Sequence, residues 1–102
     1  MSSNAIVAIL GVGVMMLIKL RLLGFFQMML GTMYLDIELP EKSTAQDLWQ
    51  ILVRRYSQLQ KEDMSKIAGM TVHGKYVQVE NWPFVLLRNG DQVDLFTQMG
   101  GG

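Results

Sequence analysis

Two short segments in which apolar and charged residues alternate constrain the fold more than any other feature of the sequence. Residues 17–23 place three apolar side chains on one face and two cations on the other, and Gly24 follows them. Residues 34–39 repeat the alternation with two acidic residues, and Pro40 ends the segment because proline lacks the donor that a central strand needs. A period of two residues is typical of a half-buried strand. We therefore expect an antiparallel pair of strands.

The segment after this pair changes to helical spacing. Ser43 with Gln46 forms a possible capping box at the start of a helix, and Thr44 with Asp47 is the alternative register. Apolar residues then recur three and four positions apart as far as residue 56. Residues 25–30, between the two strands, are bulky and apolar, which fits either a helical turn or a hydrophobic loop.

The second half of the chain contains further strand signals. The polar residues 58–66 leave room for a second short helix, and residues 70–72 and 76–79 read as two strands joined through His73-Gly74-Lys75. Turn signals follow at 81–83 and 89–91, and residues 93–97 form the last strand. The order β-β-α-β-β-β predicts an α+β fold, with a mixed sheet of four to five strands and one main helix packed on one face.

The domain boundaries follow from this order. We expect one domain over residues 15–99, an apolar N-terminal extension over 1–14 and a flexible glycine tail over 100–102. The apolar run of residues 5–18 has fourteen members, fewer than the roughly 20 needed to span a bilayer. A dispensable extension is the favoured interpretation, with an interaction segment or a targeting signal as alternatives. A cytoplasmic protein without membrane attachment is expected.

The composition excludes several classes of function. The chain has no cysteine and one histidine, His73, so thiolate metal sites, a cysteine nucleophile and a histidine-rich metal site are absent. Nine basic residues balance nine acidic ones, and no basic patch accompanies Trp49 or Trp82, so nucleic acid is not an expected partner. Both tryptophans are interpreted as packing residues and His73 as a residue beside a turn.

Several segments, taken in order, resemble a known family. They are Ile18-Lys19-Leu20-Arg21-Leu22-Leu23-Gly24, Ile37-Glu38-Leu39-Pro40-Glu41, residues 44–52, Val72-His73-Gly74-Lys75-Tyr76-Val77, residues 87–93 and the terminal Gly101-Gly102. Together they look like the ubiquitin superfamily, which has the β-grasp fold. They are most similar to its sulfur-carrier branch: the small subunit of molybdopterin synthase, the sulfur carrier of the thiamine pathway and the small archaeal modifiers.

The resemblance implies a carrier protein and not an enzyme. In the family, an E1-like adenylating enzyme uses ATP to activate the carboxylate of the terminal glycine, here Gly102, which is then converted to a thiocarboxylate. The acceptor would be an enzyme such as the molybdopterin synthase large subunit or thiazole synthase. No bound cofactor and no metal are expected. One alternative is a protein modifier joined through Gly102 to lysines of target proteins, another is a non-catalytic binding module, and the least favoured is a membrane-attached domain.

The residues expected to carry this function lie in and beside the tail. Gly101 and Gly102 lack a Cβ, which lets a narrow channel of the activating enzyme approach the backbone closely. Met99 and Gly100 are expected to enter the same partner. If Val93 and Leu95 face the core, Phe96 is exposed on the other face of the last strand, where it could serve as a docking residue. The competing view is that Phe96 is buried or shields an edge of the sheet. Arg21 is expected to supply a charge at the rim.

Overall fold

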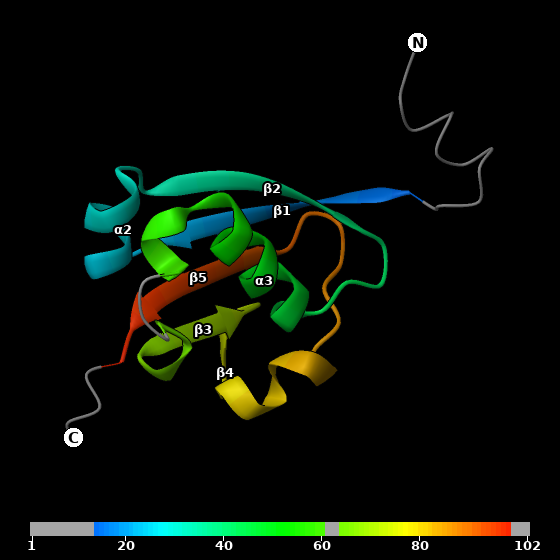
Figure 1. The fold of residues 1–102 in the computed structure, drawn as a ribbon. Coiled ribbons are helices and arrows are strands. Elements are labelled where there is room, and N and C mark those ends of the chain that lie inside the picture. Colours follow the sequence, from blue (N-terminus) through cyan, green and yellow to red (C-terminus); the bar gives the residue numbers. More distant parts are fainter. Residues whose placement is uncertain (1–13, 61–63, 99–102) are drawn as a thin grey trace, which may run out of the picture.

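A five-stranded mixed sheet forms the frame of the fold, with its strands in the order β2-β1-β5-β3-β4 (Figure 1). The computed structural model describes residues 14–60 and 64–98. The strand bounds are β1 Met15–Leu22, β2 Tyr34–Pro40, β3 Ala68–Val72, β4 Lys75–Val77 and β5 Gln92–Thr97. Of the expected extension over 1–14, only residue 14 is described, and the last residue of the expected domain, Met99, and the expected tail over 100–102 lie outside the described residues.

The strand pairing confirms the expected sheet. β1 is antiparallel to β2, with Ile18 opposite Ile37, and this is the predicted hairpin. β1 is parallel to β5, while β3 is antiparallel to both β5 and β4, so the sheet is mixed. The first strand begins two residues earlier than the alternation predicts, because Met15 and Met16 continue the pairing with Pro40 and Leu39.

The main helix, α3 Ala45–Arg55, begins in the alternative capping register. The Thr44 side chain accepts a hydrogen bond from the Asp47 backbone N–H at 3.2 Å, and the Thr44 backbone N–H donates to the Asp47 carboxylate at 2.8 Å. The Ser43–Gln46 pairing is therefore wrong by one residue. Ser43 is instead buried, with its carbonyl accepting from the Leu87 N–H at 2.9 Å, so its backbone serves the fold before the helix starts.

The remaining helical segments are short. The apolar stretch between the first two strands forms helix α2, Phe25–Leu30. The polar stretch after α3 contains two 3₁₀ turns, η1 Ser57–Gln60 and η2 Met64–Lys66, where one short helix was anticipated. The turn expected at 81–83 lies inside a longer 3₁₀ helix, η3 Val79–Phe84, so β4 ends at Val77 and not at Val79.

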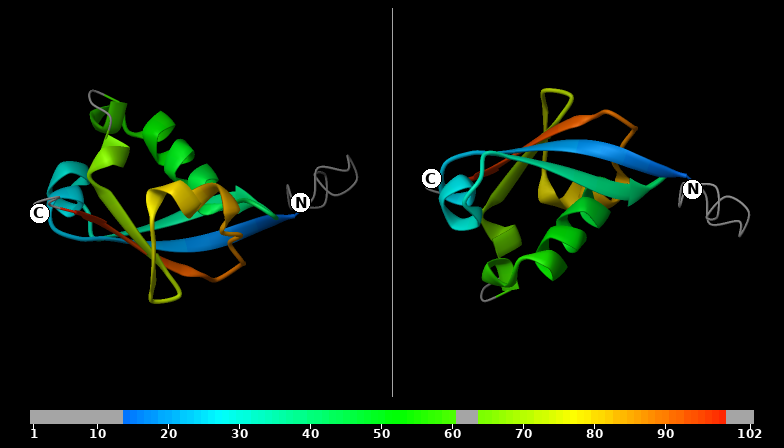
Figure 2. Two further views of the ribbon diagram at one scale, coloured as in Figure 1. Left: turned by 90° about the horizontal axis from the view of Figure 1, so that it is seen from below. Right: turned by 90° about the horizontal axis from the view of Figure 1, so that it is seen from above.

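The hydrophobic core lies between the sheet and the layer formed by α3 and η3 (Figure 2). Trp82 is completely buried, and its indole N–H donates to the Val77 carbonyl at 3.0 Å. Its ring lies 5.7 Å from that of Trp49, which lies 6.2 Å from that of Phe26. Both tryptophans are thus packing residues, as expected. The burial of Trp82 also explains the end of β4, since the chain turns there to place the indole under the sheet.

A tight turn joins β3 to β4. His73 and Gly74 have φ angles of 56° and 75°, which is the left-handed pair that a two-residue hairpin of type I′ requires. His73, expected as a strand residue beside the turn, therefore lies within the turn itself. Its Nε2 lies 3.0 Å from a carboxylate oxygen of Asp91, so the turn is tied to the segment that precedes β5.

Candidate functional site

The last described residues hold the chain in register with the sheet as far as Gln98. The Gln98 backbone N–H donates to the Ile67 carbonyl at 2.6 Å, which continues the β3–β5 pairing by one step. The Gln98 side-chain amide also donates a hydrogen bond to the Tyr76 hydroxyl. The sheet therefore fixes the chain at a point four residues before Gly102. Met99, Gly100, Gly101 and Gly102, which the sequence singled out, follow this anchored point.

Phe96 lies on the face of the sheet opposite α3, as expected, but it is half-buried. It pairs with Gly69 across β3, and an added Cβ at Gly69 would lie 2.5 Å from the Phe96 ring. The ring therefore covers the bare backbone of Gly69. On its other side the ring lies 6.4 Å from the ring of Tyr76. The ring covers backbone inside the sheet and not at its edge, because β3 and β5 are both inner strands. Only part of the ring is exposed, and its role in docking stays a prediction.

Arg21 lies in the middle of the same outer face and is paired within the chain. Its Nε and Nη2 donate to the two carboxylate oxygens of Asp94 at 3.0 and 3.1 Å. The Thr71 hydroxyl and the Gln92 amide donate to the same carboxylate at 3.2 and 3.3 Å. A partner that contacts Arg21 therefore encounters a guanidinium whose charge is already neutralised by Asp94.

The network also sets the ionisation of its members. Partial burial acts to raise the pKa of the Asp94 carboxyl, but hydrogen bonds from Arg21, Gln92 and Thr71 outweigh it, so the pKa lies below its ordinary value. The side-chain hydrogen bond with Asp94, followed by its charge, raises the pKa of the Arg21 guanidinium. Both groups are therefore charged at neutral pH, and Asp94 stays charged into the acidic range.

An exposed apolar surface lies at the end of the sheet where β5 ends. The chain just before α2 contacts β5 through a hydrogen bond from the Leu23 N–H to the Leu95 carbonyl at 2.9 Å, and the ribbon views place α2 beside this end of β5 (Figures 1 and 2). On this segment Phe25 is 43% and Met28 is 82% exposed. Sequence reasoning missed this surface, although residues 24–33 contain no charged side chain.

The described side chains do not form a cluster that could hold a metal ion. In residues 14–60 and 64–98, no three histidine or acidic residues lie together as metal ligands would. The contact between His73 and Asp91 belongs to a turn, because the other Asp91 oxygen accepts the Arg88 backbone N–H at 2.7 Å. Within the same ranges, every helix is too short or too polar to cross a membrane.

Solved structures of three archaeal proteins share the fold. The HVO 2177 protein of Haloferax volcanii has a TM-score of 0.71 and 23% identity, covering 86% of this chain and 88% of its own. A putative molybdopterin converting factor subunit 1 of Pyrococcus furiosus has values of 0.70 and 26%, covering 82% and 99%. Small archaeal modifier protein 1 of Methanosarcina acetivorans has values of 0.68 and 20%, covering 88% and 100%.

Comparison of the sequence with protein families identifies one family. No curated protein sequence matches the chain significantly. The model of the ThiS family matches residues 21–102, which is most of the chain and includes its last residue. This match and the β-grasp fold agree with the resemblance noted from the sequence. The chain belongs to the ThiS family, a group of ubiquitin-like sulfur carriers and modifiers.

Proposed function

We propose that this protein is a sulfur carrier that works through the carboxylate of Gly102. The single observation that carries the proposal is the family match, which runs to the last residue of a chain that ends in three glycines. The anchoring of Gln98 to the sheet supports it, because it fixes the position of the chain four residues before Gly102. The carboxylate, and not a side chain, is the reacting group.

The proposed chemistry has two steps on a partner enzyme. An E1-like enzyme joins the Gly102 carboxylate to the α-phosphate of ATP, which gives an acyl adenylate and releases pyrophosphate. A sulfur nucleophile then attacks the acyl carbon and displaces AMP, which leaves a thiocarboxylate. Glycine at 101 and 102 suits this reaction because a residue without Cβ can enter a narrow channel. ATP belongs to the partner, and both steps take place in the cytoplasm.

The sulfur acceptor follows from the same proposal. An enzyme that builds molybdopterin or tungstopterin, or a thiazole synthase, would take the sulfur from the thiocarboxylate. The chain would then serve as a non-catalytic subunit or carrier whose tail enters the active site of its partner. The putative converting factor from Pyrococcus furiosus, at 26% identity, supports the first acceptor class.

A second candidate function is conjugation to proteins. The fold is shared with small archaeal modifier protein 1 of Methanosarcina acetivorans, which favours a modifier joined through Gly102 to lysines of target proteins. The same adenylate serves both functions. Isopeptide adducts in cell lysate would support the modifier, whereas a persistent thiocarboxylate would support sulfur transfer.

Intact-mass spectrometry tests the carrier function. The protein is incubated with an activating enzyme, ATP and a sulfur donor, and we expect a mass gain that matches the replacement of one oxygen by sulfur. Deletion of Gly102, or Gly102→Val, should abolish the gain while the circular dichroism spectrum stays unchanged. An unchanged mass for the intact chain, with an enzyme proven active on another carrier, would refute the function and favour a binding module.

The docking role of Phe96 and its neighbours can be tested with a matched pair of variants. We expect Phe96→Ala to raise the KM of the activating enzyme for this protein, because the ring lies on the outer face two residues before Gln98. Phe84→Ala serves as the control, since Phe84 is 80% exposed but lies on η3. Equal KM values for the two variants would remove Phe96 from the interface.

A further inference from the structure

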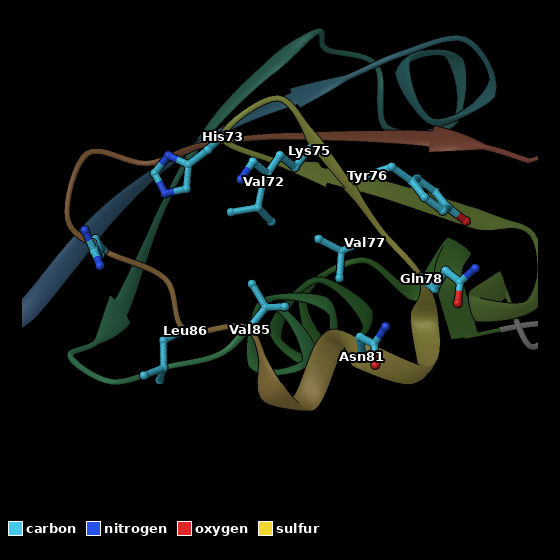
Figure 3. Close-up of a pocket in the computed structure, with 10 residues that line it drawn as sticks. Val72, His73, Lys75, Tyr76, Val77, Gln78, Asn81, Val85 and Leu86 are labelled. Carbon is cyan, nitrogen blue, oxygen red and sulfur yellow. The ribbon is translucent and has the colours of Figure 1, made fainter.

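An open groove of about 900 Å³ lies between β4 and the segment that leads from η3 towards β5 (Figure 3). Val77 from β4 and Val85 from the following segment point towards one another across its floor, and Leu86 lines its side. Leu86 is 61% exposed, so the groove presents apolar surface to solvent. Gln98, the last described residue before the tail, is not among the lining residues of this groove.

The groove carries an excess of positive charge. Its charged lining residues are Lys75 and Arg88, and no carboxylate is among its lining residues. Lys75 and Arg88 are exposed, and neither forms an ion pair within the described part of the chain. The nearby Asp91 is buried and already accepts from His73 and from the Arg88 N–H. In a chain of zero net charge, the cations are therefore locally unbalanced.

The groove also borders an unpaired strand edge. β4 is the last strand of the sheet order, so within residues 14–60 and 64–98 it pairs with β3 alone. Lys75 and Val77 lie opposite Val72 and Met70, and in a two-residue hairpin these are the pairs that exchange hydrogen bonds. Tyr76, between them, therefore directs its backbone N–H and C=O away from β3. An edge of this kind can accept a further strand.

We propose that this groove binds an extended, acidic and apolar peptide segment of a partner protein, which adds to the sheet beside β4. Backbone hydrogen bonds to Tyr76 fix the peptide as a strand. Alternate apolar side chains of the peptide contact Val77 and Val85, and its carboxylates lie near Lys75 and Arg88. The charge of the groove selects this occupant over a neutral or basic segment. The proposal is independent of the tail chemistry.

Fluorescence anisotropy with a defined probe tests the proposal. The probe is a short fluorescein-labelled peptide in which glutamate and valine alternate, and the control peptide carries lysine in place of glutamate. We expect saturable binding of the acidic peptide only. The double variant Lys75→Glu/Arg88→Glu should weaken binding about tenfold, since each reversed charge converts an attraction into a repulsion. Arg55→Glu, at an exposed position outside the groove, should change affinity by less than about twofold.

Amide hydrogen exchange distinguishes strand addition from simple charge attraction. Bound peptide should slow the exchange of the Tyr76 amide, and a peptide methylated on its backbone nitrogens should lose binding. Binding without protection of Tyr76 would overturn the proposal, as would equal affinity for the lysine peptide or for single-stranded polyuridylate. A chain that lacks Gly101 and Gly102 should bind the peptide as tightly as the full chain, which separates this test from that of the carrier function.

Discussion

Replacing Gly69 by alanine should destabilise the protein through the ring of Phe96. Gly69 lies in β3 with a backbone conformation that any residue adopts, so alanine meets no backbone strain there. The new methyl group would instead lie 2.5 and 2.8 Å from two ring carbons of Phe96 and 2.9 Å from Cγ of Gln98. These separations are well below van der Waals contact. The Phe96 ring must therefore leave the position in which it covers the strand and faces Tyr76.

The expected magnitude is the balance of two opposing effects. Alanine in a strand is favoured over glycine by about 0.5–1 kcal/mol, because glycine loses more backbone entropy on folding. Overpacking costs about 1–3 kcal/mol when the neighbour must move. Gln98 can yield at little cost, since its side chain is flexible, so the ring of Phe96 decides the sign. We expect Gly69→Ala to be destabilising by about 0.5–2 kcal/mol, which lowers Tm by roughly 2–16 °C in a domain of this size.

A double-mutant cycle measured by urea unfolding isolates the contact. In a Phe96→Ala background the clash is absent, so Gly69→Ala should stabilise the protein by about 0.5–1 kcal/mol. The change of sign between the two backgrounds is the diagnostic result. If Gly69→Ala stabilises the chain that retains Phe96, the Phe96 ring does not cover the backbone of Gly69 in solution, which would contradict the packing described above.

Three further changes test other parts of the fold. Thr44→Ala removes the side-chain cap of α3 and should lower the free energy of unfolding by about 1 kcal/mol, measured by thermal unfolding. The variant should still fold. Trp82→Phe removes the indole N–H that donates to the partly buried Val77 carbonyl and should cost about 0.5–1.5 kcal/mol in urea unfolding, the net worth of one hydrogen bond. Because the folded-state pKa of Asp94 is lowered, its stabilising contribution is present at neutral pH and lost as the pH falls through that pKa. Asp94→Asn should therefore reduce stability at pH 7 and flatten the acid limb of the stability curve, and an unchanged acid limb would show that the pair with Arg21 contributes nothing.

The sheet could be predicted from the sequence because its strands are half-buried. The inward residues of β1 and β2, such as Ile18 and Ile37, are apolar and their neighbours are charged, so the period of two is visible. The β3–β4 turn was visible for a similar reason, since His73-Gly74 supplies the residues that a tight hairpin uses. Periodicity and turn chemistry are local, and local signals survive in a single sequence.

The differences have a tertiary cause. Ser43 with Gln46 and Thr44 with Asp47 satisfy the same capping pattern. The second register is the one compatible with the contacts of this segment with residues 85–87, such as the hydrogen bond from the Leu87 N–H to the Ser43 carbonyl. Likewise, Val79 has the residue type of a strand, but burial of Trp82 draws it into η3. A pattern read along the chain does not contain these contacts between distant segments.

The glycine tail stays a prediction, because it lies outside the described residues, and the surroundings of the predicted surface residues could not be derived from the sequence. The terminal glycines are conspicuous in the sequence. The environment of Phe96, in contrast, depends on Gly69, which lies 27 positions earlier, and nothing in the sequence indicates that the two residues are in contact. The pairing of Arg21 with Asp94 likewise requires the parallel contact between β1 and β5. Arg21, which was expected to supply a charge at the rim of an interface, is consequently paired with Asp94 within the chain.

Tyr76 contributes different atoms to the groove and to the contact with Gln98. Its backbone lies at the free edge beside the groove, while its hydroxyl accepts a hydrogen bond from Gln98 at the base of the tail. A strand that pairs with Tyr76 restrains the same residue that helps to hold Gln98. If an occupied groove changes the affinity of the tail for its activating enzyme, that enzyme must change the affinity of the peptide by the same factor, because coupling between binding sites is reciprocal. Measuring the peptide affinity with and without the enzyme therefore reports on the coupling even when the sulfur acceptor is unknown.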